Sequence, residues 1–186
     1  MFFCGAIGLS RHIKESIMFR IRTEIPDDVP LVHELNALAF PTEVEADLVD
    51  VLRDNAQPAV SLVAEEHNTI VGHIMFTPVE LCGNSSLMIM GLAPMAVRPD
   101  QQKRGVGSQL VREGLDRCRD IGAGAVVVLG HPSYYPRFGF APASAINITC
   151  EYDAPDEAFM MFELTAGYLS GAEGTIRYHD AFGEVA

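Results

Sequence analysis

The chain has 186 residues, of which 48% are hydrophobic and 8% aromatic, as expected for one globular domain with or without short tails. Thirteen Lys and Arg residues against 25 Asp and Glu residues give a formal net charge of −12. Nucleic acids and anionic membranes are bound by basic protein surfaces, so this composition argues against both as partners. No apolar run in the sequence approaches the length of a membrane-spanning helix.

The N-terminal residues lack the order of a secretory signal peptide, because Arg11 and Lys14 follow the short apolar stretch instead of preceding it. We predict that residues 1–18 are an extension outside the fold. The cysteines lie far apart and form no C-x-x-C pair, so we expect free thiols in a reducing cytoplasm and no metal site. These cysteines are Cys4, Cys82, Cys118 and Cys150.

The first half of the chain predicts a strand, two helices and a hairpin. Residues 19–23 alternate apolar and polar side chains, as an edge strand does. Pro26, followed by two aspartates, opens a helix that should end at Pro41, and a capping-box pattern at 42–45 opens a second helix. Residues 59–65 and 69–77 are rich in strand-forming residues and flank a short turn, which indicates a hairpin.

A third long strand, expected over residues 87–97, contains Gly91 and Pro94. Regular central strands avoid both residue types, so a bulge or a splay is expected there. An amphipathic helix should run from Val106 until Gly122 ends it. Three later strands are expected: one over 125–129, one that starts at 138–141, and one over 159–164. The strand at 125–129 has only apolar residues, as a strand buried on both faces does.

The predicted element order is β-α-α-β-β-β-α-β-(α)-β-β, which indicates one α/β domain with a mixed sheet. We assign residues 19–165 to this domain. Residues 166–186 are expected to form a C-terminal tail that packs on the domain or extends it.

The turn at 99–108 joins a strand to a helix and contains glycines, which predicts an anion site. Free N–H groups and the positive end of the helix dipole face such a turn, and Gly105 and Gly107 let a phosphate approach the backbone closely. A Walker A loop is excluded because Lys103 precedes the glycines. A dinucleotide fingerprint is excluded because it requires a third glycine.

A third kind of phosphate loop does match. The spaced residues resemble the acetyl-CoA pyrophosphate loop of the GNAT N-acetyltransferase superfamily, whose pattern is Q/R-x-x-G-x-G/A. These residues are Val97, Pro99, Gln102, Gly105 and Gly107.

Flanking segments extend the resemblance over most of the chain from about residue 20 onward. Residues 91–97 look like the bulged strand of that family, and residues 126–130 look like the strand on the other side of the splay. Tyr135, four residues before Gly139, resembles the tyrosine of the family's Tyr-x-x-x-Gly-Phe signature. The wider run 129–140 is similar to the YhbS-like branch of the superfamily.

The resemblance implies an α/β fold of the GNAT type, with a mixed, mostly antiparallel sheet splayed at the acetyl-CoA site and helices on both faces. It also implies acetyl-CoA as the acyl-donor cosubstrate. Backbone groups of the bulged strand would pair with pantetheine and polarise the thioester carbonyl, and the loop would hold the pyrophosphate. An ordinary hydrophobic strand is the alternative. The implied acetyl-CoA contacts are Met95, Ala96, Val97, Gln102, Lys103, Arg104, Gly105, Val106, Gly107 and Ser108.

By the same resemblance, Tyr135 is the general acid that donates to the departing thiolate. An ordinary tyrosine pKa near 10 leaves it protonated at neutral pH, as a donor must be. The adjacent Tyr134 does not have the required spacing to Gly139. A tyrosine that serves only in packing is the alternative.

The general base is less clearly marked, because residues 87–97 contain no ionisable side chain where many family members have a carboxylate. His131 is the preferred candidate, since it follows the carboxyl end of a buried strand, where α/β sites open. The alternatives are His73, Glu43 and Glu45.

The predicted function is acetyl transfer to a primary amine, on a small molecule or on a protein lysine or N-terminus. No acyl-enzyme is expected, because no cysteine or serine has a visible base partner. Two alternatives stay open, namely a non-catalytic CoA-binding sensor or interaction module and an acyltransferase that uses a longer acyl-CoA or an acyl carrier protein. The protein is expected to be a monomer or homodimer, and its acidic second helix should attract a cationic amine.

Overall fold

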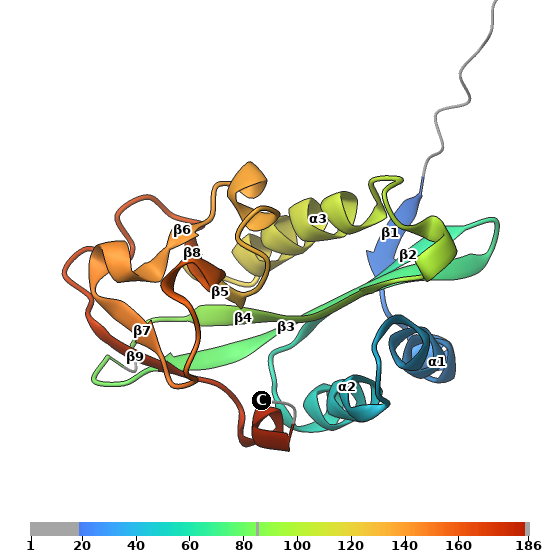
Figure 1. Cartoon of the computed structure of the whole chain (residues 1–186), viewed down its shortest axis with the longest axis horizontal. Coiled ribbons are helices and arrows are strands. Elements are labelled where there is room, and N and C mark those ends of the chain that lie inside the picture. The colour runs from blue at the N-terminus through green and yellow to red at the C-terminus, as the bar shows by residue number, and fades with distance from the viewer. Residues whose placement is uncertain (1–18, 85, 185–186) are drawn as a thin grey trace, which may run out of the picture.

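A mixed β-sheet runs through the middle of the molecule, with helices on both faces (Figure 1). The computed structural model describes residues 19–84 and 86–184, so the predicted extension 1–18 lies outside the described residues. The strand order is β1-β2-β3-β4-β5-β8-β6, and β9 pairs with both β3 and β7. The strands are β1 (Arg20–Thr23), β2 (Val60–Glu66), β3 (Thr69–Leu81), β4 (Ile89–Val97), β5 (Ala125–Leu129), β6 (Ala141–Pro142), β7 (Ile148–Cys150), β8 (Phe159–Glu163) and β9 (Gly174–Arg177).

Helices α1 and α2 lie on one face of the sheet and α3 lies on the other (Figure 1). Among the described strands, the pairs β4–β5 and β7–β9 are parallel and all other pairs are antiparallel. The α-helices are α1 (Val29–Ala39), α2 (Val44–Asn55) and α3 (Val106–Asp120). The 3-10 helices are η1 (Pro26–Asp28), η2 (Pro99–Gln101), η3 (Tyr135–Phe138), η4 (Ala143–Ile146), η5 (Asp156–Ala158) and η6 (Asp180–Glu184).

Apolar faces of the helices hold them against the sheet. The predicted amphipathic character of α3 is confirmed, because Leu110, Val111 and Cys118 on the side facing the sheet have no exposed surface. On the opposite face, Val32 of α1 and Leu52 of α2 join a second buried cluster. Burying one such side chain contributes roughly 1.5–3 kcal/mol to stability.

The predicted bulge in β4 is confirmed and leads to a splay between β4 and β5. Between the pairs Phe76↔Leu92 and Ile74↔Met95, β4 holds one more residue than β3. The parallel pairing of β4 with β5 ends at Gly91, while β5 continues to pair with β8 up to Leu129. In the described part of the chain, no strand pairs with β4 on this side beyond Gly91, so its edge is open there.

The prediction of a strand starting at 138–141 was only partly right. Residues 135–138 form η3, Gly139 takes a left-handed conformation with φ of 97°, and β6 is only two residues long. Strands β7 and β9 were not predicted. Strand β9 comes from the predicted tail and pairs with the end of β3, through Leu81↔Ile176.

Candidate functional site

Two cavities lie along β4 and meet at Met95, which lines both. The first, here called the loop cavity, has a volume of about 500 Å³ and lies at the start of α3. The second, here called the aromatic cavity, has a volume of about 420 Å³ and lies where β4 leaves β5. The loop cavity is lined by Met95, Val97, Gln101, Gln102, Lys103, Gly105, Val106, Gly107, Ser108, Tyr134 and Arg137. The aromatic cavity is lined by Phe40, Glu45, Leu48, Leu92, Ala93, Pro94, Met95, Leu129, Tyr135, Tyr152, Asp153, Tyr178 and Phe182.

The start of α3 gives the loop cavity the properties of an anion site. Gly105 caps the helix in the left-handed region, with φ of 93°, which favours glycine. The first N–H groups of the helix have no carbonyl partner within it and face the turn together with the positive end of the dipole. At Gly107, a Cβ would lie 2.8 Å from Tyr134 Oη, so the absence of a side chain makes room for this tyrosine.

Most of the acetyl-CoA contacts that the resemblance implies line the loop cavity, but Ala96 and Arg104 do not. Side chains alternate along β4, so Ala96 faces the α1 and α2 side, where it is buried. Arg104 donates to both carboxylate oxygens of Glu66, at 2.8 and 3.1 Å, and lies over the Phe19 ring.

Three residues of the loop cavity were missed by sequence reasoning: Gln101, Tyr134 and Arg137. The guanidinium carbon of Arg137 lies 4.6 Å from the centre of the Tyr134 ring. Among the described residues, Lys103 and Arg137 have no carboxylate partner, so both cations are free to pair with an anion. Arg137 lies within the Tyr-x-x-x-Gly-Phe signature, two positions after Tyr135, and this position could have indicated that it lies near the site.

Tyr135 lines the aromatic cavity while most of its ring is buried. The Tyr134 and Phe140 rings pack edge-on against it, with centroids 5.1 and 5.7 Å away. Burial raises the pKa of the Tyr135 hydroxyl above its ordinary value, with a smaller contribution from Tyr134. The hydroxyl therefore stays protonated at any working pH, in the form that donates a hydrogen bond.

Of the four base candidates, the structure brings only Glu45 to the aromatic cavity. Its carboxylate accepts a hydrogen bond from Thr42 Oγ1 at 3.0 Å. Glu43 is exposed, and His131 is exposed in the segment after β5, where it lines neither cavity. Asp153 also lines the aromatic cavity and was missed, because it lies in a loop without a recognisable pattern.

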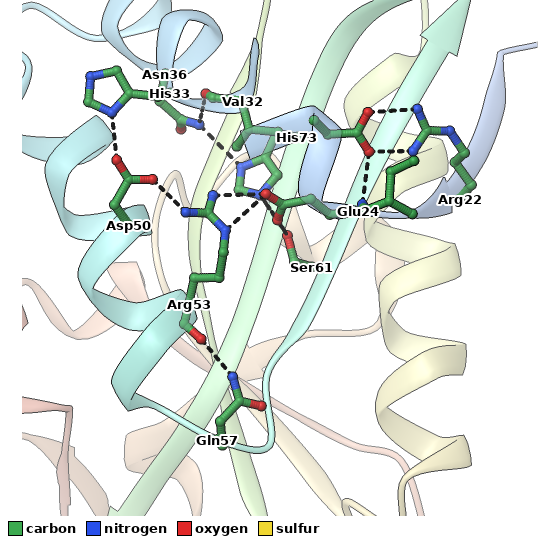
Figure 2. Close-up of polar contacts among 12 residues, drawn as sticks. Arg22, Glu24, Val32, His33, Asn36, Asp50, Arg53, Gln57, Ser61 and His73 are labelled. Carbon is green, nitrogen blue, oxygen red and sulfur yellow. Dashed lines mark hydrogen bonds and ion pairs between the residues drawn. The ribbon is translucent and has the colours of Figure 1, made fainter. Parts of the chain in front are cut away.

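His73 lies in a buried polar network between β3, α1 and α2, which Figure 2 shows. Its Nε2 lies 2.9 Å from Ser61 Oγ and its Nδ1 lies 3.2 Å from Asn36 Nδ2. Burial lowers the pKa of His73 from 6.5 to about 3, so its imidazole is neutral. It lines neither cavity, and the structure does not bring it to the site.

Within residues 19–84 and 86–184, no three His, Cys, Asp or Glu side chains are grouped to hold a metal ion. In the same ranges, no helix combines the length and the apolar character needed to cross a bilayer.

Comparison with known proteins gives consistent matches over most of the chain. Residues 20–143 match the family model described as an acetyltransferase (GNAT) domain. The chain is 37% identical over 163 residues to the uncharacterized N-acetyltransferase YhbS of Escherichia coli K12, an alignment that covers 87% of this chain and 97% of that protein. It is 41% identical over 146 residues to the uncharacterized N-acetyltransferase YjhQ of the same organism, covering 75% of this chain and 81% of YjhQ.

Solved structures agree with these matches. The crystal structure of E. coli YhbS in complex with CoA superposes with a TM-score of 0.84 at 35% identity, covering 90% of this chain and 93% of that one. A GNAT acetyltransferase from Brucella melitensis in complex with acetyl-CoA gives a TM-score of 0.73 at 33% identity, covering 89% of this chain and 99% of that one. The predicted fold and the resemblance to the YhbS-like branch are thereby confirmed.

Proposed function

Because the chain belongs to the GNAT N-acetyltransferase family, we propose that it transfers an acetyl group from acetyl-CoA directly to a primary amine. The observation that carries the proposal is the meeting of the loop cavity and the aromatic cavity at Met95, beside the open edge of β4. The loop cavity has the properties of a phosphate site and suits the donor, while the aromatic cavity, which contains the buried Tyr135, suits the acceptor. The two substrates can therefore meet at Met95. Relatives that bind CoA or acetyl-CoA support this assignment.

The residues present fit acetyl-CoA as the donor. The N–H groups at the start of α3, with Lys103 and Arg137, suit the pyrophosphate. The edge of β4 beyond Gly91 offers N–H and C=O groups to the amide groups of pantetheine, as an added strand would use them. An N–H group of this edge is also suited to polarise the thioester carbonyl.

Transfer requires a neutral amine. At pH 7, removing a proton from an amine with a pKa near 10.4 costs about 4.6 kcal/mol, so a base or a water route from the cavity is needed. The nitrogen then forms the new C–N bond as the C–S bond breaks, and the protonated hydroxyl of Tyr135 donates to the leaving sulfur. The nitrogen releases its second proton along the same base or water route, and the tyrosinate regains a proton from water. His131 stays a prediction as the base, and because it is exposed it would act through water.

Direct transfer is favoured over an acyl-enzyme because no described cysteine lines either cavity. Cys118 is fully buried on α3, and burial raises the pKa of its thiol to about 12, so it carries no thiolate at neutral pH. The cytoplasmic location predicted from the sequence is part of the proposal, and the free thiols of Cys82 and Cys150 fit a reducing compartment.

The test compares Tyr135→Phe with Tyr134→Phe by thiol release from acetyl-CoA, using an acceptor found in an amine panel. Tyr135→Phe keeps the packed ring and removes the donor, so we expect kcat to fall about 10²-fold or more while KM for acetyl-CoA changes little. Tyr134→Phe should act mainly on KM for acetyl-CoA, because Tyr134 lines the loop cavity.

Two results would contradict the proposal at different levels. Wild-type turnover by Tyr135→Phe would remove the acid role and leave acetyl transfer standing. Tight binding of acetyl-CoA by the wild-type protein, with no transfer to any amine, would favour the CoA-binding sensor instead.

A further inference from the structure

The aromatic cavity also carries information about the acceptor. We propose that the acceptor is a small cationic amine with an aromatic or aliphatic body and no carboxylate, recognised by Glu45, Asp153 and Tyr178. This inference rests on the proposed function, because it names the substrate class of the same site.

The charge of the cavity selects a cation. Its lining includes the carboxylates of Glu45 and Asp153 and no Lys, Arg or His side chain. Asp153 has no ion pair with any described cation, and Glu45 is bound only to the hydroxyl of Thr42 among the described residues. A ligand that enters as an ammonium ion would balance these two charges, whereas a ligand carboxylate would be repelled.

Aromatic side chains form a large part of the lining. The rings of Tyr152 and Tyr178 lie 5.7 Å apart, and those of Tyr178 and Phe182 lie 5.2 Å apart at 61°. Phe40, at the end of α1, adds a further ring to the lining. Such rings suit an apolar body and also attract a cation over their faces.

The hydroxyl of Tyr178 is an independent sign of a ligand. It is buried and has no hydrogen-bond partner among the described residues, which is uncommon because an unpaired buried polar group lowers stability. Burial raises the pKa of this hydroxyl well above its ordinary value, so it is a protonated donor. The ring of Tyr178 lines the aromatic cavity, so a shift of the ring on binding would let the hydroxyl donate to an oxygen of the ligand.

The size and the walls of the cavity fit a small molecule better than a protein chain. A volume of about 420 Å³ is in the range of small-ligand sites. Tyr178 and Phe182 belong to the C-terminal segment, which runs from β9 to η6 and lies against α2 (Figure 1). This segment forms one side of the cavity, so the space for a ligand is bounded by the C-terminal residues.

The experiment uses matched pairs that differ only by a carboxylate: phenethylamine with phenylalanine, isopentylamine with leucine, and cadaverine with lysine. At saturating acetyl-CoA, we expect kcat/KM to favour the decarboxylated member of each pair at least tenfold. The lower amine pKa of amino acids gives them more neutral amine, so chemistry alone would produce the opposite preference. Equal rates within the pairs, or a lysine-containing peptide as the best acceptor, would overturn the inference while leaving acetyl transfer intact.

Variants connect this preference to the cavity. Glu45→Gln and Asp153→Asn should each reduce the preference about fivefold or more, and Tyr178→Phe should raise KM for the amine several-fold. Asp54→Asn is the matched control, because Asp54 is exposed on the same helix as Glu45 and lines neither the aromatic cavity nor the loop cavity. Unchanged preference in both carboxylate variants would contradict the inference.

A binding measurement separates the inference from the proposed function. Titration of each pair into the protein saturated with CoA, followed by calorimetry, should show the same discrimination without turnover. Discrimination in binding with no acetyl transfer would contradict the proposed function and support the cavity's assignment. Equal binding within the pairs would contradict the assignment itself.

Discussion

His73 shows how a residue proposed as a base becomes part of the fold. Its ring is fully buried and contacts Ser61 and Asn36, while Ser61 donates to Glu24, which Arg53 binds at 2.8 Å (Figure 2). These partners join β2 and β3 to α1 and α2. A neutral histidine fits this network. A charged one would lose solvation, and the nearest carboxylate, Glu24 at 3.8 Å from Nε2, is already bound by Arg53 and Ser61.

This burial predicts a pH dependence of stability. The unfolded chain binds a proton at His73 near pH 6.5, but the folded chain does not until about pH 3, so the unfolded state holds more protons between these values. The free energy of unfolding should therefore fall as pH drops below 6.5, by up to about 1.4 kcal/mol per pH unit from this group. Above pH 6.5 the group contributes no slope.

Urea denaturation between pH 7.5 and 4.5 tests the prediction by comparing the wild type with His73→Gln. The variant should lose part of the slope even if it is less stable throughout, because its side chain does not titrate. His67→Asn is the control, since His67 is exposed in the β2–β3 turn and asparagine tolerates its φ of 50°. Parallel curves for the wild type and His73→Gln would show that His73 is not responsible.

At the scale of the element, the start of α3 combines two opposing demands at Gly107. Glycine inside a helix costs roughly 0.5–1 kcal/mol relative to alanine. A Cβ there would, however, lie 2.8 Å from Tyr134 Oη and 3.5 Å from Met95 Sδ, both in the lining of the loop cavity. The proposed donor site therefore explains why this position of α3 is occupied by glycine, which forms helices less well than any residue except proline.

Gly107→Ala should leave the fold as stable or slightly more stable and should raise KM for acetyl-CoA about tenfold. Thermal unfolding and steady-state kinetics measure the two effects. The double variant Gly107→Ala with Tyr134→Phe removes the hydroxyl that the new Cβ would meet. The rise in KM for acetyl-CoA caused by Gly107→Ala should therefore be smaller in the Tyr134→Phe protein than in the wild type. Additive effects would mean that the methyl group acts elsewhere.

Elements with a clear pattern were predicted well, and elements formed by distant pairing were not. The helical spacing of apolar residues located α1, α2 and α3, and the glycine and proline of β4 indicated its bulge. The predicted capping box at 42–45 is not formed, because α2 has no side-chain bond at its N-cap and Thr42 donates to the Glu45 side chain. Strands β7 and β9 have only three and four residues. Each is too short to show alternation, and β9 exists because the end of β3 offers it an edge.

At the scale of the whole molecule, the two cavities also differ in whether they arise from a local sequence pattern or from segments that are distant in the sequence. Most of the loop cavity comes from one continuous segment, residues 95–108, so most of these residues could be predicted from the spaced motif. Tyr134 and Arg137 reach the cavity from η3 and its N-cap and were missed. The aromatic cavity is assembled from the end of α1, from α2, β4, β5, η3, the loop after β7 and the C-terminal segment. Sequence reasoning did not assign Asp153 or Tyr178 to a site, because the loop after β7 brings Asp153 to the cavity and the folding of the tail over α2 brings Tyr178 there.

The assembly of the acidic cavity in a protein with a net charge of −12 predicts a dependence on ionic strength. Salt shortens the range of electrostatic attraction from about 30 Å at 0.01 M to about 3 Å at 1 M, so KM for a cationic acceptor should rise several-fold between roughly 0.05 and 0.5 M salt. The measurement holds acetyl-CoA saturating, so that salt effects on the donor do not contribute. In the double variant Glu45→Gln with Asp153→Asn, KM should be higher at low salt and nearly independent of salt. If salt leaves KM of the wild type unchanged, the net charge serves solubility alone and acceptor recognition depends on the aromatic lining.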